Sequence, residues 1–75
     1  DSIDYKYIVD KEMSLGTFMA ILRKRENLSR NQALYLMTNK NTLHPNTSSI
    51  SDIYNTDSDN DRILYFKSIK ENTFG

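Results

Sequence analysis

The chain has 75 residues, ten Lys and Arg against ten Asp and Glu, and no cysteine. A chain of this length forms one domain with a modest core, and without cysteine it has no disulfide, thiolate metal site or cysteine nucleophile. A net charge of zero argues against a general nucleic-acid binder, and the lack of a long apolar run or a signal-peptide pattern predicts a cytoplasmic domain.

The first half of the chain predicts a strand, a helix and a second strand. Residues 5–9 are aromatic and β-branched, which is typical of a strand. Ser14 is placed to cap a helix whose apolar residues follow the i, i+3, i+4, i+7 spacing of one face, and the basic run 23–25 falls in its last turn. Residues 33–38 indicate a second strand, although 29–37 could also be helical.

The second half predicts a loop, a short helix, a turn and a third strand. Residues 39–49 are rich in Asn, Thr and Ser and contain the only proline, so we expect a loop. Residues 51–54 indicate a short helical turn, 57–61 a solvated acidic turn and 63–69 a strand. The order strand, helix, strand, short helix, strand predicts an α+β fold with one helix on a mixed sheet, which is the order of the later part of a ubiquitin-like β-grasp.

An acidic run raises the question of a calcium site. Asp57, Asp59 and Asp61 have the D-x-D-x-D spacing that begins a calcium loop. Arg62 stands where that loop requires glycine, and Ser68 where it requires a bidentate glutamate. The pattern therefore favours a plain acidic turn.

Other chemistry-bearing residues are few. His44 is the only histidine, and without cysteine or a second histidine it completes no zinc site and is a poor general base. We therefore expect no metal, no cofactor, no catalytic residue and no enzyme activity. The basic run 23–25 is either a patch for phosphate or acidic peptides or a solvated helix end, and its spacing favours the solvated end.

The last residues form a polar stretch followed by Phe74 and Gly75. Terminal residues are usually frayed, and this remains the plain interpretation. A chemical interpretation is that a glycine carboxylate is the least hindered acyl group that a chain can offer for activation and transfer to a thiol and then an amine. A terminal glycine alone is a weak signal, so the choice depends on what precedes it.

Four stretches of this sequence resemble the autophagy ubiquitin-like modifiers, the family of GABARAP and microtubule-associated protein light chain 3. They are KYIVDKEMSLGTFMAILRKR, NQALYLM, ISDIY and ENTFG, and the resemblance covers nearly the whole chain. It implies a partial β-grasp domain over residues 1–70 that lacks the family's N-terminal helices and first strand. It also implies a flexible conjugation tail over 71–75, with Thr73 and Phe74 leading to Gly75.

In this family the terminal glycine is adenylated, passed as a thioester and joined to phosphatidylethanolamine, and Gly75 is the matching position. The implied partners are activating and conjugating enzymes, a deconjugating cysteine protease, motif-bearing cargo receptors and, after conjugation, a phosphatidylethanolamine membrane, with no nucleic acid. The resemblance thus implies a cytoplasmic protein that reaches the autophagosome membrane when lipidated. Two alternatives are a β-grasp peptide-binding module that is never conjugated and a modifier conjugated to protein.

The family also binds peptides with an aromatic-x-x-aliphatic motif, which add a strand to a sheet edge and fill two pockets. By matching position, residues 5–9 would be that edge strand, and Arg25 a helix-end cation that contacts the acidic flank of the motif. Spacing alone makes the apolar residues among them ordinary core. The matching aromatic-pocket residues are Lys6, Ile8 and Ile63, and the aliphatic-pocket residues are Tyr7, Val9, Phe18, Ile21 and Leu22.

Overall fold

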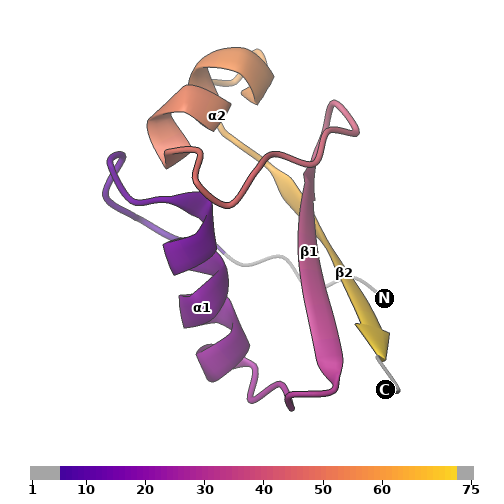
Figure 1. The fold of residues 1–75 in the computed structure, drawn as a ribbon. Coiled ribbons are helices and arrows are strands. Elements are labelled where there is room, and N and C mark those ends of the chain that lie inside the picture. Colours follow the sequence, from indigo (N-terminus) through magenta and orange to yellow (C-terminus); the bar gives the residue numbers. More distant parts are fainter. Residues whose placement is uncertain (1–5, 73–75) are drawn as a thin grey trace.

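The computed structural model describes residues 6–72 of the chain. Its elements follow the order helix, strand, helix, strand, and the two strands form an antiparallel sheet (Figure 1). This partial α+β arrangement confirms the predicted fold class. The elements are α1 (Leu15–Arg25), β1 (Gln32–Thr38), α2 (Ile50–Asp57) and β2 (Phe66–Asn72).

Both helices begin at a serine that caps the first turn. The Ser14 hydroxyl accepts a hydrogen bond from the Thr17 amide at 3.1 Å, and the Ser49 hydroxyl accepts one from the Asp52 amide at 3.1 Å. A capping hydroxyl satisfies an amide that has no partner inside the helix. The helix predicted after Ser14 is confirmed, whereas the short turn predicted at 51–54 is an eight-residue helix.

The sheet is smaller than the sequence predicts and antiparallel instead of mixed. β1 pairs with β2 from Gln32 opposite Asn72 to Thr38 opposite Phe66. The strand expected at 5–9 is absent over residues 6–9. A strand needs a neighbour for its backbone groups, and in the part of the chain that the structure describes the sheet consists of β1 and β2 alone. The helical alternative for 29–37 is wrong, since β1 occupies most of that range.

The last strand begins later than predicted. It was expected over 63–69, but β2 begins at Phe66 and continues to Asn72. A turn holds the residues before it, because the Asp59 amide donates to the Ile63 carbonyl at 3.0 Å and the Ile63 amide donates to the Asp61 carboxylate at 3.0 Å. Arg62 lies in this turn with φ 64, in the left-handed region that favours glycine.

The core lies between α1, α2 and the face of β1 that points toward α1 (Figure 1). Alternate residues of β1 are buried, which follows the two-residue period of a strand with one covered face. Within residues 6–72, no helix has both the length and the apolar character needed to cross a membrane. The buried apolar residues are Leu15, Phe18, Leu22, Leu34, Leu36, Ile50 and Ile53.

Candidate peptide-binding face

The segment that enters α1 is held in place by the loop between β1 and α2. The Met13 amide donates to the Asp10 carbonyl at 3.0 Å, which turns the chain toward the helix. The first amides of α1 then donate outside the helix, from Leu15 to the Ser48 carbonyl at 2.8 Å and from Gly16 to the Asn46 carbonyl at 2.9 Å. These bonds fix the start of α1 against that loop.

Tyr7 is the residue of this segment that packs most clearly on α1. Its ring lies edge-on to Phe18, with ring centroids 5.6 Å apart and an interplanar angle of 81°. The guanidinium carbon of Arg25 lies 5.3 Å from the centroid of the same ring. Such edge-on pairs and cation–ring contacts are favourable because the ring face is electron-rich and its edge electron-poor. The structure thus brings together three of the residues that the resemblance singled out.

The other predicted aliphatic-pocket residues divide between core and surface. Leu22 is buried beside Phe18, and Val9 packs against the same cluster. Ile21 lies on the outer side of α1 with 44% of its surface exposed. Phe18 and Leu22 are buried and belong to the core, whereas Tyr7 and Val9 are partly buried against it.

The predicted aromatic-pocket residues are on the surface. Ile8 is fully exposed, Lys6 is exposed, and Ile63 is 45% exposed in the turn before β2. Side chains therefore alternate along residues 6–9. Tyr7 and Val9 are partly buried, whereas Lys6 and Ile8 are exposed to solvent. The residues predicted for conjugation, Thr73, Phe74 and Gly75, lie outside the described residues, and β2 ends three positions before Gly75.

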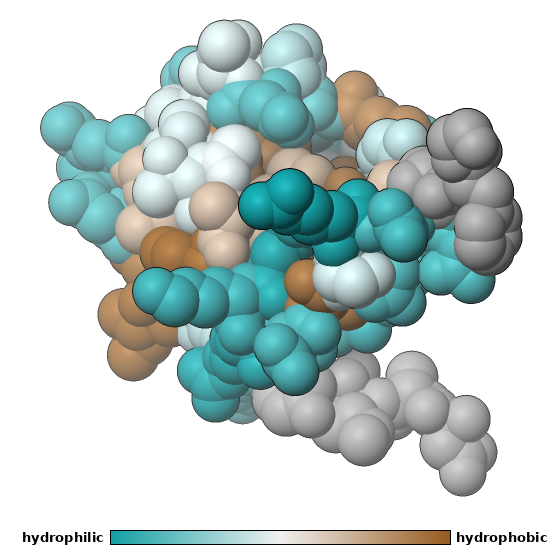
Figure 2. Space-filling model, turned by 60° about the horizontal axis from the view of Figure 1, so that its bottom comes forward, coloured by the Kyte–Doolittle hydropathy of each residue, from teal (hydrophilic) through white to brown (hydrophobic). Residues whose placement is uncertain are grey.

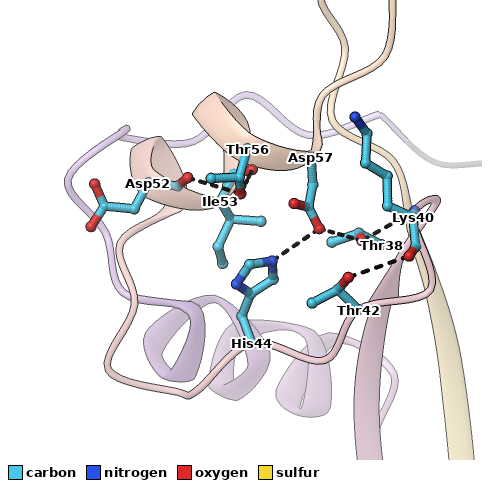
Figure 3. Close-up of polar contacts among 8 residues, drawn as sticks. All are labelled: Thr38, Lys40, Thr42, His44, Asp52, Ile53, Thr56 and Asp57. Carbon is cyan, nitrogen blue, oxygen red and sulfur yellow. Dashed lines mark hydrogen bonds and ion pairs between the residues drawn. The ribbon is translucent and has the colours of Figure 1, made fainter.

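A buried polar cluster at the opposite end of the sheet joins three elements (Figure 3). One carboxylate oxygen of Asp57, the last residue of α2, accepts a hydrogen bond from the Thr38 hydroxyl at 2.5 Å. His44 Nε2 lies 2.9 Å from the same oxygen. The cluster ties the end of β1, the loop that follows it and the end of α2 together.

The environment of Asp57 lowers its pKa from 3.8 to about 2. The hydrogen bond from Thr38 is the main cause, and hydrogen bonds from His44 and Thr56 add to it, whereas burial acts in the opposite direction. The expectation that Asp57 belongs to a solvated turn is therefore wrong, because only 6% of its surface is exposed.

The rest of the acidic run stays at the surface. Asp61 accepts hydrogen bonds from the Tyr65 hydroxyl and the Ile63 amide, and these lower its pKa. Over the described residues no three His, Asp or Glu side chains are placed to hold a metal ion.

Sequence reasoning missed the partners of His44 and Asp57, which lie 13 positions apart and contact each other only after folding. It also missed Arg23, which was assigned to a solvated helix end. Its guanidinium donates to the carbonyl oxygens of Ser29 at 2.9 Å and Gln32 at 2.6 Å. Nothing in the local pattern separates these residues from ordinary exposed polar ones.

Comparisons with known proteins agree on one family. The family model described as autophagy protein Atg8, ubiquitin-like, matches residues 2–75. Autophagy-related protein 8A of Oryza sativa subsp. indica is 41% identical over 70 residues, which are 93% of this chain and 58% of the relative. Autophagy-related protein 8c of Arabidopsis thaliana is 40% identical over the same shares of the two chains.

A solved structure gives the same result. The crystal structure of Trypanosoma brucei ATG8 superimposes with a TM-score of 0.78 at 38% sequence identity, over 92% of this chain and 59% of that one. The chain thus spans a little under three fifths of the length of the relatives that it matches. It belongs to the Atg8 family of ubiquitin-like autophagy proteins.

Proposed function

We propose that this chain acts in autophagy as a ubiquitin-like modifier whose Gly75 carboxylate is joined to the amine of phosphatidylethanolamine. The family match that extends through residue 75 carries the proposal. Two acyl chains attached at Gly75 would anchor the domain, since one chain gives only marginal binding. The partners would be activating and conjugating enzymes and a deconjugating cysteine protease, in the cytoplasm and at the autophagosome membrane.

We further propose that residues 6–9 and α1 receive receptors that carry an aromatic-x-x-aliphatic motif. In support, Tyr7 packs on Phe18 under Arg25, while Ile8 points to solvent. Residues 6–9 belong to no strand of the described fold. A peptide that adds a strand here would use main-chain hydrogen bonds for affinity and the flanking side chains for specificity. Arg25 would then exchange part of its contact with Tyr7 for an acidic side chain of the motif.

The test of conjugation is the intact mass of the chain after incubation with the Atg8 activating and conjugating enzymes, ATP and phosphatidylethanolamine vesicles. We expect a gain of one lipid on wild type and none on a variant that ends at residue 74. Gly75→Ala should be lipidated poorly or not at all, because a β-carbon crowds the acyl group in the narrow sites of both enzymes. A known Atg8 protein runs alongside as the positive control.

A failure of lipidation while the control reacts would contradict the proposal. Binding of a motif peptide without lipidation would then favour a docking module that is never conjugated. A mass gain on an added protein amine instead of on lipid would favour a protein modifier.

A further inference from the structure

The chain has zero net charge, but its basic and acidic residues are unevenly distributed. We call residues 23–32 and 70–72 together the basic end; they hold five Lys and Arg against two Glu. In contrast, α2 and the turn after it, residues 50–62, hold four Asp and one Arg. Figure 1 places these two groups at opposite ends of the molecule. Figure 2 turns the lower end forward and shows a face that is mostly hydrophilic.

Specific contacts assemble the basic end from three segments. Arg23 donates to the Ser29 and Gln32 carbonyls, which fastens the turn after α1 to the helix. The Lys70 ammonium pairs with the Glu26 carboxylate, which brings β2 to the end of α1. Among the described residues this is the one salt bridge of the basic end. It neutralises Glu26 and leaves Lys24, Arg25 and Arg30 exposed, against one exposed acidic residue, Glu71.

The proposed conjugation would hold this end near a membrane. Gly75 lies three positions after Asn72, where β2 ends. An extended residue spans at most about 3.6 Å, so a lipid on Gly75 would keep Asn72 within roughly 10 Å of the headgroups. Electrostatic attraction acts over about that distance at physiological ionic strength, where the Debye length is about 8 Å.

We propose that the basic end is a membrane-contacting face for anionic phospholipids, engaged once Gly75 is anchored, with α2 pointing away from the bilayer. This inference rests on the proposed lipid conjugation. Each Lys or Arg near an anionic leaflet favours contact by about fivefold, so Lys24 and Arg30, which the proposed peptide contact does not use, favour it by roughly 25-fold in a domain that is already tethered. A membrane is a more suitable partner for this face than nucleic acid. A chain with zero net charge lacks the basic excess that nucleic-acid binding needs, whereas a lipid on Gly75 would already hold the face near the bilayer.

The test uses a chemical anchor in place of the enzymes. The chain has no cysteine, so Gly75→Cys provides one thiol for coupling to a maleimide derivative of phosphatidylethanolamine in vesicles. The vesicles contain phosphatidylcholine alone or with phosphatidylserine. Hydrogen exchange read by mass spectrometry then reports protection of the backbone amides in residues 26–31.

We expect exchange of residues 26–31 to slow by about fivefold or more on phosphatidylserine vesicles and to be unchanged on phosphatidylcholine. Raising the salt to about 1 M, where the Debye length is about 3 Å, should abolish the protection in the unaltered sequence. The double variant Lys24→Glu with Arg30→Glu should lose it at low salt. The matched control, Lys40→Glu with Lys67→Glu, makes the same change in net charge near the α2 end and should keep it.

Equal protection on both vesicles, or protection that survives Lys24→Glu with Arg30→Glu, would overturn the inference. So would equal protection of the unanchored chain by duplex DNA, which would make the face a general polyanion site. The melting temperature of each double variant is measured to check that it is folded. The salt dependence is measured on the anchored chain without charge substitutions, so that arm of the test does not depend on the folding of a charge variant. The anchor is attached chemically, so this experiment does not need the conjugating enzymes. Failure of the enzymatic assay contradicts the proposed lipid conjugation, whereas failure of this experiment contradicts membrane contact by the basic end.

Discussion

Asp57 is the residue whose chemistry depends most on the fold. Its carboxylate is buried yet charged, because Thr38, His44 and Thr56 hydrogen-bond to it. Folding lowers its pKa from 3.8 to about 2, so the folded state binds a proton there less readily than the unfolded state does. The stability that this carboxylate contributes is therefore present above pH 3.8 and is lost as the pH falls toward 2.

We predict that Asp57→Asn lowers the melting temperature at pH 7 by several degrees, as expected for a loss of about 1–2 kcal/mol in a domain of this size. The difference from wild type should shrink between pH 4 and about pH 2. Thermal unfolding followed by circular dichroism over this range measures it. Asp59→Asn, at an exposed acidic residue two positions away, is the control. A difference that stays constant with pH would contradict the role of the charge.

Gly16 is a second residue whose role appears only in three dimensions. A glycine in the first turn of α1 costs roughly 1 kcal/mol of helix stability relative to alanine. A β-carbon at this position would lie 3.2 Å from Cβ of Asn46 and 3.3 Å from its carbonyl oxygen. The glycine lets the loop approach closely enough for the Gly16 amide to donate to the same carbonyl. Close packing of the loop therefore offsets the cost in helix propensity.

At the scale of the elements, the two helix N-termini lie against each other. Ser14 and Ser49 form an isolated antiparallel bridge, and both have the same extended backbone, with φ −77 and ψ 154. Each serine caps its own helix, while the Ile50 amide donates to the Met13 carbonyl at 2.8 Å. The caps thus start two helices and also join them.

We predict that Ser14→Ala lowers the free energy of unfolding by about 1 kcal/mol, because the Thr17 amide loses its acceptor. Ser14→Asp should retain most of the stability, since a carboxylate also accepts this bond and suits the helix N-terminus. Urea unfolding of the three proteins makes the comparison. Equal losses in both variants would show that the hydroxyl acts by some contact other than capping.

At the scale of the whole molecule, the proposed peptide face and the proposed conjugation residue belong to different parts of the chain. The peptide face is formed by residues 6–9 with α1, and Gly75 follows β2. Phe18 is a poor probe of the peptide face, because its ring is buried and its removal would cost about 3–5 kcal/mol of stability in a small domain. Tyr7 is half-buried on top of it and is the better probe.

We predict that Tyr7→Ala weakens binding of an aromatic-x-x-aliphatic peptide by about two- to tenfold, since an aromatic contact contributes about 0.5–1.5 kcal/mol. Lipidation of the same variant should match wild type. Calorimetry measures the first and intact mass the second. Tyr35→Ala removes an exposed tyrosine from β1 and is the control. Undiminished peptide affinity in Tyr7→Ala would remove residues 6–9 from the proposed site.

The sequence by itself determined the features that depend on near neighbours along the chain. The cap at Ser14 and the apolar spacing after it predicted α1, and the aliphatic and aromatic run before Thr38 predicted β1. The motifs up to Gly75 also indicated the family. These features are local because helix capping, residue periodicity and motif chemistry are set within a few positions.

Only the tertiary structure decided the features that depend on distant partners. Residues 6–9 have strand-like composition but form no strand, because strand formation needs a neighbour and not only propensity. The bounds of β2 follow from its register with β1 and from the turn that holds Ile63. Asp57 is buried because Thr38 and His44 reach it from other parts of the chain, and such contacts leave no periodic signal in the sequence.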